Sequence, residues 1–296
     1  MGNMNRTPPR EIQESLRKEV NFGCPVQLCG VPYLTFHHFD PVWREKEHHN
    51  PDGMVALCAK HAAQADGGRW TKEQLRRMKE NPYVTLDKVS EYYGYLRRNV
   101  VCIAGFVSYG MKNVLEIHGE RVIGFEIDVE GYHRLNLFIR NRTGSPVLVM
   151  ENNYWTALSR ELFDLRCSYR GRELEIISKD KQTELSMRFD DCSVDVFKQQ
   201  LIDSYAQSLQ KSRPPRLNNT SSWIEESLQT CKLNIEELVS QMGNPRSVPT
   251  WTMRGRLNWG SFHLEFQDWR IEELNRHMMF TGAIAVGGGG AAFSFG

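Results

Sequence analysis

The sequence shows no bias toward charge of one sign, and it lacks any long hydrophobic run. Its 37 lysines and arginines nearly balance 36 aspartates and glutamates, which leaves a formal net charge of +1. This excludes a strongly basic domain that binds nucleic acid through its overall charge, so any such contact must use local patches. No stretch reaches the roughly eighteen apolar residues of a membrane span, and the chain starts without an apolar signal segment. We therefore expect a cytoplasmic protein that does not bind membranes.

The sequence also lacks the even number of cysteines typical of a disulfide framework. Of its seven cysteines, Cys24, Cys29 and Cys58 lie near one another, and the other four are scattered. In a cytoplasmic protein this pattern indicates one metal site together with reduced thiols.

The apolar content is sufficient for two folded units. A chain of 296 residues with 40% hydrophobic residues can form two ordinary domains. Helical spacing predicts a lead-in helix over 10–20, and a capping box at Thr71 predicts a helix that stops near Asn81. Alternating or β-rich runs predict strands at 122–129, 134–139, 145–150 and 174–177, and helices are expected at 194–210 and from 221 or 222 toward 242.

The predicted fold class is α+β. The predicted parts are an N-terminal module with its lead-in helix over 1–82, a helical connector over 83–100, a mainly β domain over 101–210, a linker with a helical and aromatic-rich segment over 211–280, and a flexible Gly-rich tail over 281–296.

Two close pairs of metal-binding residue types lie in the N-terminal module. Cys24 and Cys29 form the first pair, and Cys58 and His61 form the second. Two such pairs supply the four ligands of a closed tetrahedral zinc site. The alternative is that they are ordinary buried thiols and a surface histidine. We expect a structural zinc, because so short and loop-rich a segment cannot bury enough apolar surface to fold alone.

Between these pairs, a β-prone run presents two adjacent histidines. The elements Cys24-x4-Cys29, His37-His38-Phe39-x-Pro41 and Gly53-Met-Val-Ala-Leu-Cys58-x2-His61 together resemble the HNH endonuclease family over roughly residues 22–80. The resemblance implies a ββα-metal module that hydrolyses DNA phosphodiester bonds. It also implies that His38 is the general base and that His37 binds a single catalytic Mg²⁺ or Mn²⁺, distinct from the zinc. A neutral imidazole with a pKa near 6.5 can accept a proton from water, and the cation stabilises the charge that attack builds on oxygen.

The chain departs from the family pattern at two positions. The family's final histidine, a second ligand of the catalytic ion, falls on Ala62. Three explanations stand open: a deliberate inactivating substitution, a naturally degenerate site, or a substitute ligand from His48, His49 or Asp66. His48 and His49 can also be solvated loop residues, and only one of them, His49, is expected to face the site. The family's middle asparagine falls on Gly53, so Asn50 or Asp52 is expected to orient the base.

Several cations in the module, or on the helix after it, are candidates for contact with DNA, although a solvated helix face explains each of them nearly as well. They are Arg44, Lys60, Arg69, Lys72, Arg76 and Arg77.

Residues 100–296 contain no motif that indicates a reaction. Trp251, Trp259 and Trp269 alternate with arginines and predict either core packing or stacking on bases. An unrestrained nuclease endangers its host, so we expect this part to be a restraint, a sensor of a small molecule or partner protein, or an oligomerisation platform. By analogy alone, a nuclease joined to a sensor suits antiviral defence. The alternative is a catalytically silent zinc module that binds nucleic acid or a protein partner, with Ala62 marking the lost catalysis.

Overall fold

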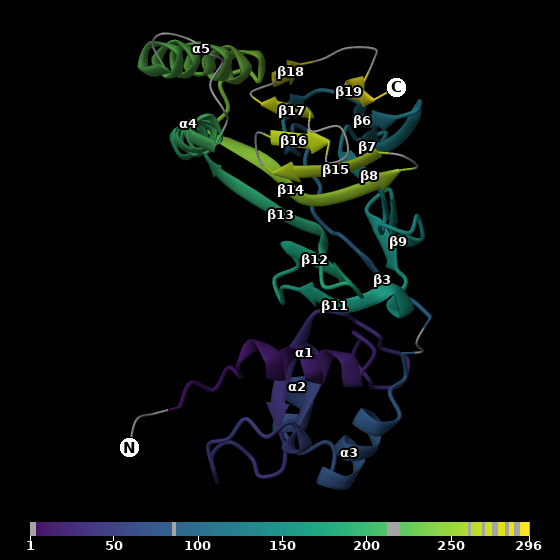
Figure 1. Cartoon of the computed structure of the whole chain (residues 1–296). Coiled ribbons are helices and arrows are strands. Elements are labelled where there is room, and N and C mark those ends of the chain that lie inside the picture. The colour runs from purple at the N-terminus through teal and green to yellow at the C-terminus, as the bar shows by residue number, and fades with distance from the viewer. Residues whose placement is uncertain are drawn as a thin grey trace. The chain divides into compact units, whose positions relative to one another are not determined.

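The computed structural model describes residues 4–84, 87–211, 220–259, 262–267, 270–273, 278–281, 284–286 and 291–295. Its chain divides into two compact units, coloured by residue number in Figure 1. Unit 1 comprises Met1–Gly94 and Tyr154–Thr183, and unit 2 comprises Tyr95–Asn153 and Glu184–Gly296. Both units contain helices and strands, and strands predominate. The predicted α+β class with mostly β structure is confirmed.

The N-terminal part of unit 1 is a hairpin with helices around it. The elements are α1 (Arg10–Glu19), β1 (Leu34–His38), the 3-10 turn η1 (Pro51–Gly53), β2 (Met54–Cys58), α2 (Ala59–Asp66) and α3 (Lys72–Glu80). β1 and β2 pair antiparallel, with Leu34 opposite Cys58 and His38 opposite Met54. Every residue of β2 is buried, and the core of this part also takes in Leu16 of α1 and Leu75 of α3.

The boundaries of α1 and α3 follow from local sequence. α1 begins directly after Pro9, matching the predicted lead-in helix. At α3, the Thr71 side chain accepts from the Gln74 amide at 3.3 Å, and the Gln74 side chain accepts from the Thr71 amide at 2.9 Å. This is the predicted capping box, which satisfies backbone donors that the helix leaves free.

The remainder of unit 1 is β structure. β3 (Val89–Tyr92) pairs antiparallel with β10 (Tyr154–Ala157), and the short turn η2 (Ser159–Glu161) leads to the hairpin of β11 (Leu162–Cys167) and β12 (Glu173–Ser178). The helical connector predicted over 83–100 is wrong, because β3 occupies its middle. The strand that pairs with β3 lies more than sixty residues further along the chain. The local pattern of residues 83–100 therefore gives no sign of this pairing.

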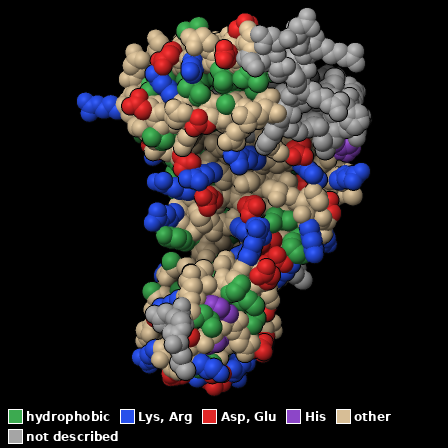
Figure 2. All heavy atoms as spheres, turned by 60° about the vertical axis from the view of Figure 1, so that its left-hand side comes forward, with side chains coloured by type: hydrophobic (Ala, Val, Ile, Leu, Met, Phe, Trp, Pro, Cys, Tyr) green, Lys and Arg blue, Asp and Glu red, His purple; other side chains and the backbone are tan. Residues whose placement is uncertain are grey.

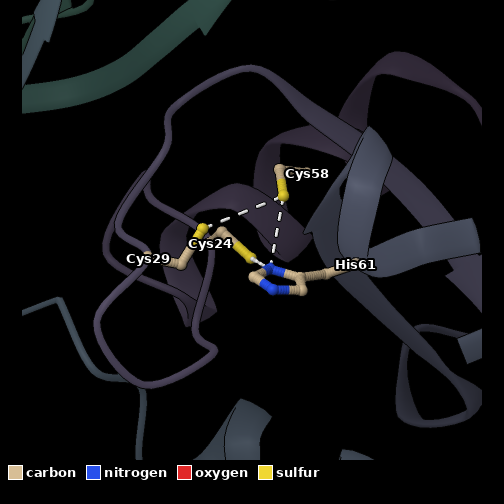
Figure 3. Close-up of side chains that lie close together, drawn as sticks. All are labelled: Cys24, Cys29, Cys58 and His61. Atoms are coloured by element: carbon tan, nitrogen blue, oxygen red, sulfur yellow. Dashed lines mark hydrogen bonds between the residues drawn. The ribbon is translucent and has the colours of Figure 1, made fainter. Parts of the chain in front are cut away.

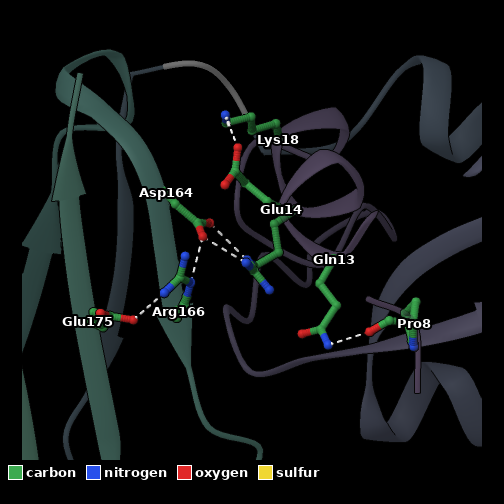
Figure 4. A network of polar contacts seen from close by, with 8 residues as sticks. Pro8, Gln13, Glu14, Lys18, Asp164, Arg166 and Glu175 are labelled. Atoms are coloured by element: carbon green, nitrogen blue, oxygen red, sulfur yellow. Dashed lines mark hydrogen bonds and ion pairs between the residues drawn. The ribbon is translucent and has the colours of Figure 1, made fainter. Parts of the chain in front are cut away.

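Buried charges join α1 to this β structure (Figure 4). Arg17 donates from Nε and Nη2 to the two carboxylate oxygens of Asp164, at 2.9 and 2.7 Å. Arg166 donates to Asp164 at 2.7 Å and to Glu175 at 2.6 Å. Burial raises the pKa of Asp164, but the hydrogen bonds and charges of Arg17 and Arg166 outweigh that effect and bring the pKa below its usual value.

Unit 2 is built from β-sheets with two helices. Its strands are β4 (Val101–Ile103), β5 (Val107–Tyr109), β6 (Asn113–Ile117), β7 (Glu120–Ile127), β8 (His133–Arg140), β9 (Pro146–Glu151), β13 (Thr183–Ser193), β14 (Ser247–Trp259), β15 (Phe262–Gln267), β16 (Arg270–Glu273), β17 (Met278–Thr281), β18 (Ile284–Val286) and β19 (Ala291–Phe295). One series runs β19-β6-β7-β8-β9 and another β13-β14-β15-β16-β17. Helices α4 (Val194–Lys211) and α5 (Thr220–Gln241) bury Phe197 and Ile235 with Val101 and Val107.

The end of the chain differs from the prediction. The tail over 281–296 is not a flexible segment throughout, since β18 pairs with β5 and β19 pairs with β6, both in parallel. Backbone pairing with distant strands orders these residues, and composition alone gives no sign of it. The four glycines 287–290 and most of the predicted linker at 211–220 lie outside the described residues.

The tryptophans of unit 2 favour core packing over base stacking. Trp251 is fully buried and Trp259 is 6% exposed. Trp251 stacks on Phe125 with ring centroids 5.2 Å apart, whereas Trp269 lies outside the described residues. Among the helices in the described part of the chain, none combines the length and the apolar character needed to cross a membrane.

Candidate functional site

The two predicted ligand pairs come together in unit 1 (Figure 3). Cys24 and Cys29 lie in the loop after α1, Cys58 ends β2, and His61 lies in the first turn of α2. The His61 Nδ1 atom lies 3.3 Å from the sulfur of Cys24 and 3.3 Å from the sulfur of Cys58. The sulfurs of Cys29 and Cys58 are 3.8 Å apart, and all four ligand atoms lie within 4.8 Å of one another.

These distances fit a tetrahedral ion. Zinc bound to thiolates at about 2.3 Å places two sulfurs about 3.8 Å apart, and a sulfur and an imidazole nitrogen about 3.5 Å apart. Burial raises the pKa of the Cys24 and Cys29 thiols, so an ion must displace their protons when it binds. The group can therefore hold a metal ion such as zinc. Within the described residues it is the one such cluster of three or more His, Cys, Asp or Glu side chains.

A tight turn brings the first pair together. The Cys24 amide donates to Val31 at 2.9 Å, and the Gly30 amide donates to the Cys24 carbonyl at 3.2 Å. Leu28 and Gly30 both have φ near the left-handed region, at 63° and 68°. Glycine adopts this conformation without a steric cost, which explains the residue at position 30.

His38 lies in a closed aromatic environment. It is 2% exposed, and both of its ring nitrogens are buried without a hydrogen-bond partner. Its ring centroid lies 4.6 Å from that of Trp43, 5.1 Å from that of His48 and 6.0 Å from that of His49. Burial is the main cause that lowers the pKa of His38 to about 4. His38 is therefore neutral at pH 7, the form that can accept a proton.

The two loop histidines differ in role. The Nδ1 of His48 accepts from the Asn50 amide at 3.1 Å, so the proton is on Nε2, which donates to the Pro41 carbonyl at 2.8 Å. His48 is thus a buried residue that fixes the loop, and its interpretation as a solvated residue is wrong. The His49 ring stacks on Trp43 at 5.6 Å, and its Nδ1 is buried without a partner.

Backbone atoms, rather than Asn50 or Asp52, hold the end of β1. The Asn50 side chain accepts from the Asp52 amide at 3.3 Å and caps η1, and neither residue bonds to the His38 ring. The Gly53 carbonyl accepts from the amides of Phe39 at 2.9 Å and Asp40 at 3.2 Å. A Cβ at Gly53 would lie 1.9 Å from the Asp40 carbonyl oxygen, so an asparagine does not fit where the family has one.

His37 has different neighbours from His38, because successive side chains of a strand point in alternate directions. Its Nδ1 lies 3.2 Å from Asp66 Oδ1, and its side chain is 6% exposed. Burial lowers the pKa of His37, although the Asp66 carboxylate opposes this shift. Ala62, one turn before Asp66 on α2, is half-buried against the core of unit 1 and offers no ligand atom.

The predicted DNA-contacting cations fall into two groups, those with an intramolecular partner named below and those described only as exposed. Lys72 and Arg76 both bind Asp40, at 2.9 and 2.7 Å, and these hydrogen bonds lower the pKa of Asp40. Arg69 contacts Gln64 and the Trp70 ring. The side chains of Arg44, Lys60 and Arg77 are exposed. On the face of unit 1 drawn in Figure 2, cationic and acidic side chains are interspersed rather than separated into one basic patch.

Sequence reasoning did not single out Asp40 or Trp43. In the sequence, the one sign of their importance is their position, since both residues follow His38 in the loop that covers the His38 ring. No protein-family model, curated protein or solved structure matches this chain.

Proposed function

We propose that this protein is a metal-dependent endonuclease of the HNH type that hydrolyses phosphodiester bonds in DNA. The observation that carries the proposal is the order of elements around the histidines. The first strand of an antiparallel hairpin, β1, ends in His37 and His38, and the second strand, β2, continues directly into α2. The three cysteines and His61 gather beside the same hairpin and helix. A zinc ion bound by these three cysteines and His61 would stabilise the fold and take no part in the reaction.

In this proposal His38 accepts a proton from the water that attacks phosphorus. The neutral state of His38 at pH 7 supports this role. Because His38 is 2% exposed, Trp43 or His49 has to shift before water and substrate reach its ring. His37, next to His38 at the end of β1, would bind Mg²⁺ or Mn²⁺, and the bound cation would supply charge stabilisation at the phosphoryl oxygens. Exposed Arg44, Lys60 and Arg77 are available for phosphate contacts.

The test is cleavage of plasmid DNA with Mg²⁺ or Mn²⁺ by the parent chain and by Ala62→His. We expect faster cutting by Ala62→His, and loss of about 100-fold or more when His38→Ala is added. His118→Ala, which removes a histidine of unit 2, is the matched control. Undiminished cutting by a folded, zinc-loaded protein with both Ala62→His and His38→Ala would refute the assignment of the base.

Ala62 favours a second candidate, a catalytically silent zinc module that binds nucleic acid or a protein partner. This candidate predicts retained zinc and DNA binding, with no cleavage by Ala62→His. For either candidate, we propose that the protein acts in the cytoplasm and that unit 2 controls unit 1, by sensing a small molecule or partner protein or by self-association. Such control would suit antiviral defence. Light scattering of the purified chain tests the self-association.

A further inference from the structure

We propose that Asp66 and His37 together form a divalent-cation site in unit 1, with Asp66 as the ligand that replaces the residue missing at position 62. This inference rests on the proposed function and specifies its cation site. It starts from the 3.2 Å approach of His37 Nδ1 to Asp66 Oδ1.

Hydrogen bonds and ring contacts exclude the two other candidates for a substitute ligand. Both nitrogens of His48 are already occupied, by the Asn50 amide and the Pro41 carbonyl. The His49 ring stacks on Trp43 and neighbours His38 rather than His37. Of the three residues that could replace a ligand at position 62, Asp66 alone contacts His37.

Helix geometry explains why Asp66 can take this place. Residues 62 and 66 are one turn apart on α2, and side chains four residues apart lie on the same face of a helix. A longer side chain at 62 and the carboxylate at 66 therefore reach toward the same point. Asp66 is the last residue of α2, and its side chain is 58% exposed. Water and a substrate phosphate can thus complete the coordination.

The distance suits an octahedral cation, and the carboxylate of Asp66 is a ligand that hard cations prefer. Two neighbouring ligands of an octahedral ion, each at about 2.1 Å, lie about 3.0 Å apart, close to the 3.2 Å between the two atoms. Mg²⁺ usually keeps several waters and binds through one or two carboxylates, so two protein ligands are sufficient. Arg6 lies 3.9 Å from the same carboxylate and competes with a cation for it.

The experiment measures Mn²⁺ binding to the full, zinc-loaded chain by the loss of the free Mn²⁺ signal in electron paramagnetic resonance. We expect Asp66→Asn and His37→Ala each to weaken binding by about tenfold or more. Arg6→Gln should tighten binding, because it removes the competing guanidinium. Glu80→Gln is the matched control, since it neutralises an exposed carboxylate elsewhere in the module, and it should leave binding unchanged.

Asp66 could instead only orient His37, so a second variant separates ligation from positioning. Asp66→His replaces an oxygen ligand by an imidazole, which should shift preference from Mn²⁺ toward Ni²⁺ if residue 66 touches the ion. A fall in affinity for both metals by the same factor would overturn the ligand assignment and leave Asp66 as a positioning residue. Mn²⁺ affinity that Asp66→Asn leaves intact would also overturn it.

The binding data also separate this inference from the proposed function. If His37→Ala weakens Mn²⁺ binding but Asp66→Asn does not, the cation site stands and the inference about Asp66 fails. If neither variant changes Mn²⁺ binding, the cation site itself fails and with it the nuclease proposal. Mn²⁺ binding that depends on both residues supports the inference even when the purified chain cuts no DNA.

Discussion

Arg17 shows how strongly a single buried residue can hold unit 1 together. Its guanidinium lies in the protein interior, paired with the fully buried carboxylate of Asp164 from another part of the chain. Two charges removed from water are stabilised only while both partners are present. Arg166 also binds Asp164, but it is shared with Glu175 and cannot fully replace Arg17.

We therefore expect Arg17→Ala to lower the free energy of unfolding of unit 1 by about 3 kcal/mol, because it leaves the Asp164 carboxylate short of a partner. Urea denaturation followed by circular dichroism measures the change. Arg10→Ala, which removes an exposed arginine from the same helix, is the control and should cost much less. Equal effects of the two substitutions would show that the buried pair contributes little.

The Arg17 effect should also depend on pH. The pKa of Asp164 is below its usual value in the folded protein, against about 3.9 for an unfolded aspartate. Such a group contributes stability above the unfolded pKa and loses it as the pH falls through the folded pKa. The difference between the parent chain and Arg17→Ala should thus be constant near neutral pH and shrink below about pH 4. A difference that grows on acidification would contradict the assignment.

Residues close in sequence could be predicted much better than residues brought together by the fold. The two pairs of residues in the metal-binding cluster, and the adjacent His37 and His38, are patterns of short spacing, which a single pass along the sequence detects. The partner of Arg17 is 147 residues away, and the contact of His37 with Asp66 depends on how α2 lies against β1. Neither kind of contact leaves a local pattern.

At the scale of elements, the hairpin of β1 and β2 depends on a residue without a side chain. Gly53 ends η1, and its carbonyl bonds the two amides that follow His38. The sequence indicated this glycine only as a departure from a family pattern. Its physical reason is the close approach of the Asp40 carbonyl, which any Cβ at position 53 would meet at 1.9 Å.

We expect Gly53→Ala to destabilise unit 1 by about 3 kcal/mol, because backbone must shift to admit the methyl group. The hairpin, and with it the position of His38, should be disturbed. Chemical denaturation gives the stability, and the His38 ring resonances in nuclear magnetic resonance report the local change. Gly67→Ala is the matched control, since a Cβ there meets its nearest atoms at an ordinary 3.5 Å. Unchanged stability of Gly53→Ala would mean that the loop after β1 adapts freely.

Some strands and helices were predicted from the sequence and others were not. The difference depends on whether the pattern lies within the element or in its pairing with a distant strand. The runs that became β7, β8, β9 and β12, and the helices α1, α3, α4 and α5, carry their periodicity within one element. β3, β18 and β19 are short, and pairing with distant partners orders them. Residues 154–183 belong with unit 1 rather than with the β domain that surrounds them in the sequence, and no composition change marks that boundary.

At the scale of the whole molecule, the two units differ in what stabilises them. Unit 1 contains the cysteine and histidine cluster beside its apolar core, whereas unit 2 has an apolar core and, in its described residues, no such cluster. A structural zinc ion contributes about 10 kcal/mol or more at pH 7, comparable with the whole stability of a domain. Removal of the metal should therefore act on one unit and spare the other.

We expect the purified chain to hold a single zinc ion, and a strong chelator to unfold the region from Cys24 to His61 while β7 and β8 of unit 2 stay folded. Hydrogen exchange with mass spectrometry resolves the two regions, and atomic absorption gives the zinc content. Cys58→Ser should reproduce the effect of the chelator, whereas Cys192→Ser, outside the cluster, should retain zinc and protection. Full protection of residues 24–61 after the zinc is gone would show that their apolar core suffices alone, and the ion would then be dispensable for the fold.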